Sequence, residues 1–462
     1  MQHIAEDVDF LFIYEVRPRE IDSICLLGAW LETQGYKVGY INSWDSMYHW
    51  HPEYRAKVAV LSACYNTAAY DYFTGHALSF EKVVNLQWEQ VLMNSVAYSK
   101  VQTIWDFDGK SKEIRHVSWG ENNRQYLQKK YGLGDDKMRV CGYLPLDFYR
   151  PELRGATMEK GQLFAKYGLD PAKKTLLFIS SFADADKPKS EIDLQNGDAR
   201  EQEDKRVVQS TSQRMIVDWF RKLAKEDPEI QIIYRPHPAE ANNPGILQTA
   251  REVPGFHVIT GESIRNWILN CDVMCNWQST SMIELYASGK KTLILRPQEI
   301  PFLFAMPILE EGHYKAVTSY EELVAGIREE NPEFPVEKDM LLQFYSMTEQ
   351  PVHERVGQYL IDILQDPDYR CPECGPHESP KGRVLHRQQL KFATAKAKAV
   401  HGIWKLFGGE KGKDGKLTPR GAKIKEDYAH YCYYVQKMRL NSISNRELRE
   451  KIDSYKAMIR KA

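Results

Sequence analysis

The sequence predicts an α/β protein built from two doubly wound domains and followed by a basic, mainly helical tail. Three observations lead to this prediction. Short apolar runs alternate with helical patterns up to Pro151, a second alternation of the same kind follows, and lysine and arginine begin to dominate near Pro380. A chain of 462 residues is also too long for one hydrophobic core. We therefore expect domains over residues 1–152 and 153–365, and a linker with a tail over residues 366–462.

Within residues 1–152, strands are expected where apolar residues run together and helices where they recur at every third or fourth position. The first helical pattern covers residues 20–34, and Gly35 ends it because glycine tolerates the left-handed backbone that closes many helices. The other expected elements are strands at residues 8–16, 36–42, 57–62, 82–86 and 137–141, short apolar runs at 101–107 and 114–119, and a helix at 122–131. This order of elements predicts a sheet covered by helices.

Residues 153–365 repeat the pattern. A helix is expected at residues 213–225, before the Asp227-Pro228 stop, and the last helix of the core is expected at residues 352–365. Residues 182–203 show no periodicity and follow a strand, so we expect a long polar loop that acts as a lid over a site. The expected strands are residues 175–180, 230–234, 257–260, 271–276 and 291–295.

The composition is that of an ordinary globular protein, with 43% hydrophobic and 27% charged residues. No apolar run is long enough to predict a membrane span, and the first residues lack a secretion-signal pattern. Scattered cysteines favour reduced thiols in the cytoplasm. Cys371 and Cys374 have the spacing of half a zinc site, but no second such pair follows, so we expect a reduced linker turn and no metal.

The formal net charge of −1 hides an asymmetry between the body and the tail. Residues 380–462 contain 21 lysines and arginines against 7 aspartates and glutamates, a surplus of +14 (21 − 7) that leaves −15 for the rest. A basic tail on an acidic body predicts an anionic partner. Helices are expected at residues 388–406 and 425–461, and their basic, aromatic pattern fits an anionic membrane surface. An assembly partner, packing on the core and a solvated extension stay open; no nucleic-acid partner is expected.

Two segments in the second half predict an anion site. Tyr234-Arg235-Pro236-His237-Pro238 stands where the strand at residues 230–234 ends, and ligands of open parallel sheets collect at such carboxyl ends. Gln278-Ser279-Thr280-Ser281 follows the strand at residues 271–276 and opens a helical segment. Backbone N–H groups and hydroxyls at a helix start suit a phosphate. The candidate phosphate ligands are therefore Arg235, His237, Ser279, Thr280 and Ser281.

Two consecutive α/β domains with His-Pro and Ser-Thr-Ser motifs in the second resemble GT-B-fold glycosyltransferases, which have two Rossmann-like domains facing a cleft. The pattern looks like bacterial surface-polysaccharide enzymes, among them sialyltransferases, Kdo transferases and teichoic-acid polymerases that use CDP-glycerol. Residues 117–120 (Val-Ser-Trp-Gly) and 139–152 (Arg-Val-Cys-Gly-Tyr-Leu-Pro-Leu-Asp-Phe-Tyr-Arg-Pro-Glu) also resemble the domain-closing stretch of surface carbohydrate biosynthesis proteins. The likeness covers about residues 8–365, and nothing familiar covers the tail.

The resemblance implies roles for the two motifs. His237 would contact the donor phosphate and stabilise the leaving nucleotide, and the hydroxyls of Ser279, Thr280 and Ser281 would hold the same phosphate. The donor would be linked to CMP or CDP, and no further cofactor would be needed.

Other residues around these motifs are candidates for the donor site. Arg235 would stabilise the phosphate charge, with an ion pair to Glu240 as the structural alternative. Glu284 would grip a ribose hydroxyl, and a solvent-facing helix glutamate is the alternative. Asn276 and Gln278 would read the base or the ribose.

The acceptor hydroxyl needs a general base, which is expected from the first domain. Glu89 follows the fourth strand and Asp22 follows the first, so both stand at carboxyl edges, and these two are the candidates. Arg17 and Arg19 stand beside Asp22 and would bind an anionic sugar. The alternatives are Glu15, Glu20 and Asp108, the last within Asp106-Phe107-Asp108-Gly109, a loose match to the acidic motif of sialyltransferases.

We therefore expect a GT-B glycosyltransferase of bacterial surface polysaccharide (capsule or O-antigen) synthesis. It would pass Kdo or a sialic-type sugar from a cytidine-activated donor to a growing or lipid-linked glycan, in the cytoplasm or at the inner face of the membrane. One alternative is transfer of a polyol phosphate from CDP-glycerol or CDP-ribitol, with a second histidine among His49, His51 and His76. The other is a non-catalytic nucleotide-binding scaffold of a polysaccharide assembly complex.

Overall fold

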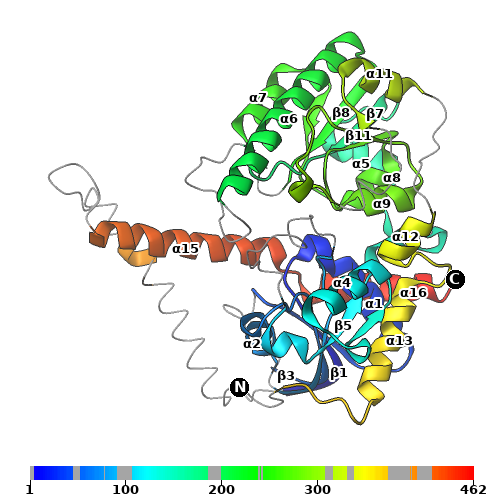
Figure 1. The fold of residues 1–462 in the computed structure, drawn as a ribbon, viewed down its shortest axis with the longest axis vertical. Helices are drawn as coiled ribbons and strands as arrows, with labels where there is room; N and C mark the ends of the chain where they lie inside the picture. The colour runs from blue at the N-terminus through cyan, green and yellow to red at the C-terminus, as the bar shows by residue number, and fades with distance from the viewer. Residues whose placement is uncertain are drawn as a thin grey trace. The chain divides into compact units, whose positions relative to one another are not determined.

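The chain divides into two compact units (Figure 1). Its computed structural model describes residues 5–44, 53–77, 79–90, 107–185, 199–237, 240, 243–306, 316–329, 338–372, 396, 398–402 and 419–461. Unit 1 comprises Met1–Trp88, Asp108–Val117 and Val356–Ala457, and unit 2 comprises Glu89–Phe107, Ser118–Arg355 and Met458–Ala462. Each unit is described by itself below.

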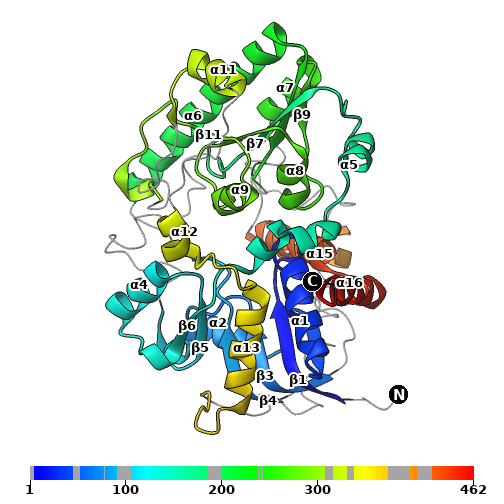
Figure 2. The ribbon, with the colours of Figure 1, turned by 90° about the vertical axis from the view of Figure 1, so that its right-hand side faces the viewer.

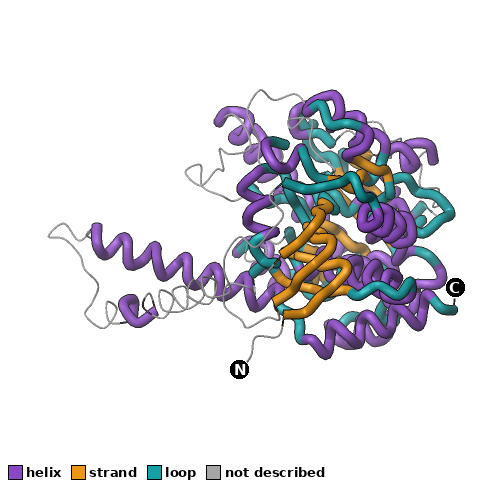
Figure 3. The backbone as a smooth tube through the Cα atoms, turned by 90° about the horizontal axis from the view of Figure 1, so that it is seen from below, coloured by secondary structure: helices purple, strands orange, loops and turns teal. Residues whose placement is uncertain are grey.

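The first sheet has six strands in the order β2-β1-β3-β4-β5-β6, and its pairs from β2 to β5 are parallel. Figure 3 shows its strands side by side in orange with helices packed beside them. The order reverses between β1 and β3, and ligands of open α/β sheets bind outside the carboxyl ends at such a reversal. The elements are β1 (Ala5–Tyr14), α1 (Arg17–Thr33), β2 (Val38–Asn42), β3 (Glu53–Leu61), α2 (Thr67–Thr74), β4 (Ser79–Asn85), β5 (Arg115–Ser118), α4 (Glu121–Tyr131) and β6 (Met138–Val140).

The second sheet also has six strands, all paired in parallel, in the order β12-β11-β10-β7-β8-β9. Its order reverses between β7 and β10, so the carboxyl ends of these two strands mark the crevice where a ligand is expected. The elements are α5 (Lys160–Tyr167), β7 (Lys174–Ile179), α6 (Ala199–Glu226), β8 (Ile230–Arg235), α7 (Pro244–Glu252), β9 (Phe256–Val258), α8 (Ile264–Asn270), β10 (Val273–Asn276), α9 (Met282–Ser288), β11 (Thr292–Leu295), β12 (Ala316–Val317), α11 (Tyr320–Arg328) and α12 (Lys338–Tyr345).

The strands of the second sheet are apolar on both faces because each face is covered. Leu177 and Ile233 pack into a core with residues of α8 and α9, whereas Leu176 and Phe178 pack into another with residues of α6 and α11. Alternate side chains of a strand point to opposite faces, and sheets covered on both sides read as continuous apolar runs. The two sheets with flanking helices confirm the predicted doubly wound α/β architecture.

The helix predicted at residues 213–225 is longer than expected. It is α6, which begins at Ala199, so the loop predicted to reach residue 203 ends earlier. Most residues of its first turns are good helix formers, and Arg206 forms an ion pair with Glu203 one turn away. The prediction of a lid concerns residues 182–203, of which residues 186–198 lie outside the described part of the chain.

The helix predicted at residues 352–365 is α13 (Val352–Gln365), and side chains secure both of its ends. The buried Asp147 carboxylate, in the 3₁₀ segment η4 (Leu144–Tyr149), accepts the backbone N–H groups of Val352 at 2.8 Å and His353 at 2.7 Å. At the other end the Lys82 ammonium donates to the carbonyl oxygens of Ile363 and Leu364. Figure 2 shows α13 beside the first sheet. The helix starts in unit 2 and continues in unit 1.

The single tail helix predicted at residues 425–461 is wrong, because the structure has two helices, α15 (Pro419–Asn441) and α16 (Asn445–Ile459). The break at residues 442–444 has a local cause: the Ser444 hydroxyl accepts the backbone N–H of Glu447 at 3.1 Å, as a helix cap does. The helix predicted at residues 388–406 lies mostly outside the described residues.

Helix α16 packs on α1 within unit 1. Its Ile452 and Tyr455 are buried, and its cations meet acids of α1: Lys451 pairs with Asp22 at 2.8 Å, and both Arg449 and Lys456 pair with Glu32. Among the described residues, no helix combines the length and apolarity needed to cross a bilayer.

Candidate functional site

Arg235 is the last residue of β8 and its guanidinium is fixed by backbone. Nη1 donates to the Gly261 carbonyl at 2.7 Å and Nη2 to the Glu262 carbonyl at 2.5 Å. Because residues alternate along a strand, Arg235 lies on the same face as Ile233, which is the face that α8 and α9 cover. Loss of hydration lowers the pKa of Arg235 to about 10, so the group stays cationic at neutral pH. The structure therefore places a fixed positive charge at this edge.

The ion pair between Arg235 and Glu240, considered as the structural alternative, is replaced by a different arrangement. The buried Glu240 carboxylate accepts the Tyr234 hydroxyl at 2.6 Å and the Phe182 backbone N–H at 3.0 Å, and its own N–H donates to the His237 carbonyl at 2.8 Å. Glu240 thus joins the turn after β8 to the turn after β7. His237 is partly exposed and is held in place through its backbone.

The turn after β10 is organised by Asn276, which is fully buried. Its Oδ1 accepts the Ser279 N–H at 2.9 Å and its Nδ2 donates to the Ser279 carbonyl at 3.4 Å. Gln278 is also buried; its side-chain amide donates to the Phe304 carbonyl. These two amides shape the turn from within, whereas Ser279 and Ser281 are partly exposed and Thr280 is exposed.

Strand β7 separates β8 from β10, so the two predicted motifs flank its carboxyl end. Neighbouring strands lie about 4.8 Å apart, which puts the ends of β8 and β10 about 10 Å from each other. That spacing leaves room for a phosphate between side chains reaching inward from both strands. The hydroxyl of Ser181, just after β7, accepts the Gln278 N–H at 3.3 Å and connects the middle strand to the turn after β10. The motifs therefore share the edge at which the strand order reverses.

Glu284, on α9, adds an acid to this cationic edge. Tyr149 Oη donates to its Oε1 at 3.3 Å, and the guanidiniums of Arg265 and Arg235 act on it electrostatically. Loss of hydration raises the pKa of Glu284 to about 7, although these three groups work against the rise. Glu284 therefore changes its charge near neutral pH.

The predicted acceptor residues lie in unit 1 and are engaged by the tail. The Asp22 carboxylate pairs with Lys451 at 2.8 Å. Arg17 pairs with Glu447 at 2.5 Å, and its backbone N–H donates to the Asn441 side chain at 2.9 Å. Arg19 donates to Glu20 at 2.8 Å. These contacts fix α1 and the corner between α15 and α16 relative to each other.

The other base candidates occupy different settings. Glu20 is fully buried, and its carboxylate accepts the Glu15 and Val16 backbone N–H groups and the Ser62 hydroxyl at the reversal of the first sheet. Glu89 is half-buried after β4. Asp108 starts a 3₁₀ turn as its cap. Asp106, His49, His51 and Cys374 lie outside the described residues.

Sequence reasoning missed four residues of the edge in unit 2: Tyr149, Ser181, Glu240 in its bridging role, and Arg265. Ser181 had a usable signal, since it follows directly on a predicted strand. Tyr149 stands in the segment 139–152, which resembled the domain-closing stretch, but nothing marked its partner. Arg265 had no signal in the sequence.

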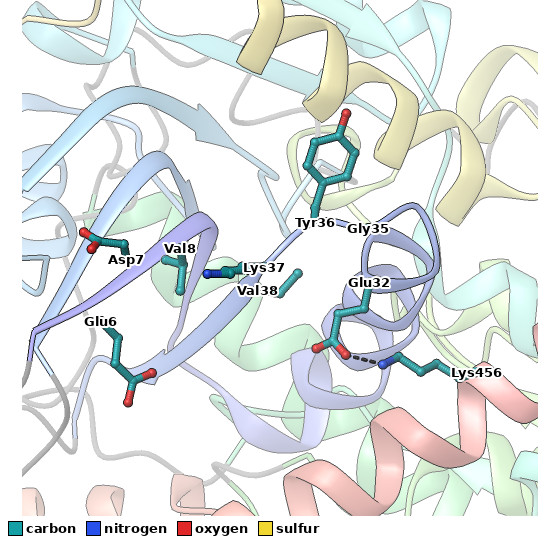
Figure 4. Close-up of a pocket in the computed structure, with 9 residues that line it drawn as sticks. All are labelled: Glu6, Asp7, Val8, Glu32, Gly35, Tyr36, Lys37, Val38 and Lys456. Atoms are coloured by element: carbon teal, nitrogen blue, oxygen red, sulfur yellow. Dashed lines mark hydrogen bonds and ion pairs between the residues drawn. The ribbon is translucent and has the colours of Figure 1, made fainter.

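A hollow in unit 1 lies away from the sites just described (Figure 4). Its walls come from the first residues of β1, the turn before β2, and α1 and α16, so it opens at the amino edge of the first sheet. Figure 4 shows Glu32 and Lys456 paired at its side. Parallel sheets bind ligands at the opposite edge, and we assign no donor role to this hollow. Its lining residues are Glu6, Asp7, Val8, Glu32, Gly35, Tyr36, Lys37, Val38 and Lys456.

Solved structures resemble the chain, whereas no protein-family model and no curated protein sequence matches it. The wall teichoic acid polymerase TagF superposes with a TM-score of 0.50 at 11% identity, over 79% of this chain and 91% of that one. The chain has the two-domain GT-B fold. MnaA of S. aureus, solved with UDP, has a TM-score of 0.48 at 14% identity, over 78% of this chain and 98% of that one. The UDP-GlcNAc 2-epimerase of Methanocaldococcus jannaschii, in complex with UDP-GlcNAc and UDP, also has 0.48, at 12% identity over 77% and 99%.

Proposed function

We propose that the chain is a glycosyltransferase of cell-surface polysaccharide synthesis that uses a nucleotide-activated donor. The observation that carries the proposal is the carboxyl edge of the second sheet. There Arg235 and His237 follow β8, Ser279 follows β10, and the strand order reverses between β7 and β10. A fixed guanidinium, an imidazole and hydroxyls form a donor set for an anion, and the GT-B fold makes a nucleotide phosphate the natural candidate.

In the proposed reaction, the sugar–phosphate bond of the donor breaks and negative charge collects on the departing nucleotide. Arg235 and His237 would stabilise that charge, with help from the hydroxyls of Ser279, Thr280 and Ser281. Donors fixed in advance act strongly because they need no reorganisation as charge develops. The anchoring of Arg235 on two carbonyl groups and of His237 through Glu240 supports such a fixed arrangement.

The donor is proposed to be cytidine-activated, with Kdo or a sialic-type sugar as the group transferred. Transfer of a polyol phosphate from a CDP-linked donor is the second candidate. One observation favours it: TagF, whose fold the chain shares, is named as a wall teichoic acid polymerase and was also solved after a soak with CDPG.

The general base is proposed to be Glu89 or Asp22, and Arg17 and Arg19 are proposed to bind an anionic acceptor. Asp22 would have to release Lys451 before it could take a proton. An acceptor that displaces Lys451 would do this, because it would also bring the hydroxyl to be deprotonated.

A panel of nucleotides tests the proposal. CMP, CDP, UDP, UDP-GlcNAc and CMP-Kdo are added to the full-length protein, and the thermal unfolding midpoint is measured. A ligand at 100 times its dissociation constant stabilises the folded state by about 2.7 kcal/mol. We expect cytidine ligands to raise the midpoint. A response to uridine ligands alone would refute the cytidine donor, and no response to any nucleotide would favour the non-catalytic scaffold.

A substitution tests the role of the imidazole. His237→Ala should lower the transfer rate by about 10²–10³-fold, since it removes a fixed donor from the leaving phosphate. His257→Ala is the matched control, because His257 lies within β9 of the same unit rather than at the carboxyl edge of β8. Circular dichroism should show the same fold for both variants. Turnover by His237→Ala within a few-fold of the wild-type rate would contradict the phosphate role.

A further inference from the structure

Tyr149 is a buried tyrosine whose hydroxyl faces the Glu284 carboxylate. Its side chain is 8% exposed, and its Oη lies 3.3 Å from Glu284 Oε1. Burial raises the pKa of Tyr149 well above its usual range, so the hydroxyl keeps its proton and donates it to the carboxylate. A donor of this kind favours the ionised form of a carboxyl group.

Glu284 faces charged groups on two further elements. Arg265 of α8 lies with its Cζ 4.0 Å from the ring centre of Phe148, and its Nη2 donates to the Ala156 carbonyl at 3.2 Å. Arg235 of β8 is held by the carbonyl groups of residues 261 and 262. Both guanidiniums are therefore fixed by other groups and act on Glu284 through space. Within the described part of the chain, Tyr149 is the side chain that donates a hydrogen bond to it.

These opposing effects leave Glu284 close to half ionised at neutral pH. Burial raises its pKa to about 7 against the effects of Arg265, Tyr149 and Arg235. A group so balanced responds strongly to the loss of a single hydrogen bond. The hydroxyl of Tyr149 is the partner that can be removed with least disturbance, since phenylalanine keeps the ring and its packing.

We propose that Tyr149 is a positioning residue of the donor site, which holds the Glu284 carboxylate ionised and oriented to accept both hydroxyls of a ribose. The inference rests on the proposed nucleotide-binding function of this edge. An ionised carboxylate offers two acceptor oxygens, which match the two O–H donors of a cis-diol, whereas a protonated carboxyl carries a donor of its own. Tyr149 would thereby set the pH range over which a ribonucleotide donor binds, and distinguish it from a deoxynucleotide.

The test compares Tyr149→Phe with a matched control, Tyr320→Phe. Tyr320 is also 8% exposed, and its hydroxyl donates to the Glu226 carboxylate at 2.6 Å. Glu226 ends α6 ahead of β8, so this pair stands at the amino edge of the second sheet. Both substitutions thus remove a buried hydroxyl from a carboxylate, but only one removes it beside Glu284.

Two quantities are measured on the full-length protein between about pH 6 and pH 9, the range in which a carboxyl of this pKa titrates. The first is the titration midpoint of Glu284 without nucleotide, from the side-chain carboxyl signal of ¹³C-labelled glutamate, assigned by its loss in Glu284→Gln. The second is the Kd of CDP, UDP and their 2′-deoxy forms. Titration of the nucleotide phosphate is common to all variants and cancels in the comparison.

Tyr149→Phe should raise the Glu284 midpoint by about one pH unit, the effect of losing one hydrogen bond to a charged group. The ionised fraction at pH 7 then falls from about one half to about one tenth, and the Kd of the ribonucleotide rises about fivefold. Near pH 9 the two proteins should bind equally well, since both are ionised there. Tyr320→Phe should match the wild type throughout, and Glu284→Gln should lose both the pH dependence and the preference for ribose.

An unchanged Glu284 midpoint in Tyr149→Phe would overturn the inference, and so would weaker binding by the same factor at every pH, which would indicate a packing role. Failure of the wild type to bind any nucleotide would overturn the ribose role together with the proposed function. That failure is distinguishable, because the midpoint is measured without nucleotide.

Discussion

Replacing Asp147 with asparagine should destabilise the start of α13 by about 3–5 kcal/mol, as is typical when one partner of a buried charged group is removed. Asp147 is fully buried, and each of its oxygens accepts two donors. Oδ1 accepts the Val352 N–H at 2.8 Å and Arg150 Nε at 3.0 Å. Oδ2 accepts the N–H and Nδ1 of His353, both at 2.7 Å.

The magnitude follows from this arrangement. Asparagine replaces one oxygen with an NH₂ group, and whichever way the amide turns, that group faces two donors that have lost their acceptor. An unsatisfied buried donor costs about 1–3 kcal/mol, so two of them account for most of the expected loss. The carboxylate charge that offset the positive donors is lost as well.

Calorimetric unfolding of the full-length protein measures the effect. For a unit of this size, each kcal/mol moves the unfolding midpoint by about 2–4 °C, so a decrease of about 6–20 °C is expected. Asp135→Asn is the matched control in the same unit: its side chain is 80% exposed and pairs with Arg124, and such surface pairs contribute about 0–1 kcal/mol. Equal shifts for the two variants would refute the reasoning.

Acid adds a second readout for Asp147. Burial acts to raise its pKa, but the hydrogen bonds and charge from His353 and the backbone N–H groups outweigh burial and hold the pKa below its usual range. A carboxyl whose pKa is lower in the folded state stabilises the protein above its unfolded pKa of about 4, and loses that contribution as pH falls through the folded value. The difference between wild type and Asp147→Asn should therefore narrow below about pH 4. A constant difference down to strong acid would contradict this assignment.

Two other substitutions test packing within unit 1. Ile452→Ala should destabilise the protein by about 2–4 kcal/mol, because Ile452 of α16 is only 2% exposed; Leu440→Ala on α15, 58% exposed, should change stability by less than about 0.5 kcal/mol, and similar effects would show that α16 does not dock in solution. Gly357→Ala should cost about 1–3 kcal/mol, since its new Cβ would lie 2.3 Å from the Trp30 ring; thermal unfolding checks both, and an unchanged midpoint for Gly357→Ala would argue against close packing of α13 on α1.

The sheets could be predicted from the sequence because their strands are unusually legible. Buried parallel strands form continuous apolar runs, and residues 230–234 and 271–276 were found for that reason. The helix ends were harder. Helix α6 starts fourteen residues before the predicted start at 213, because its early turns are polar and show no buried face in the pattern. The break between α15 and α16 depends on one serine cap, which a long basic stretch concealed.

The candidate site could be predicted only as far as strand ends reveal it. Arg235 and Ser279 directly follow apolar runs, so position alone identified them. Their surroundings could not be foreseen, because Tyr149 and Glu284 are 135 positions apart in the chain and meet only through the fold. Glu240 shows the same limit from nearby: its charge suggested Arg235 as partner, whereas burial directs it to Tyr234 and the backbone.

The contacts of α16 also change how the charge asymmetry is read. A surplus of cations in the tail predicts an anionic partner, and for Arg449, Lys451 and Lys456 that partner is α1 of the same chain. These cations are therefore partly neutralised before any outside anion approaches. A membrane or an acidic glycan would instead meet α15, where Lys425 and Arg439 are exposed beside Leu440. Charge reversal on α15 should consequently weaken binding to anionic vesicles, whereas charge reversal on α16 should mainly loosen the packing of the tail on α1.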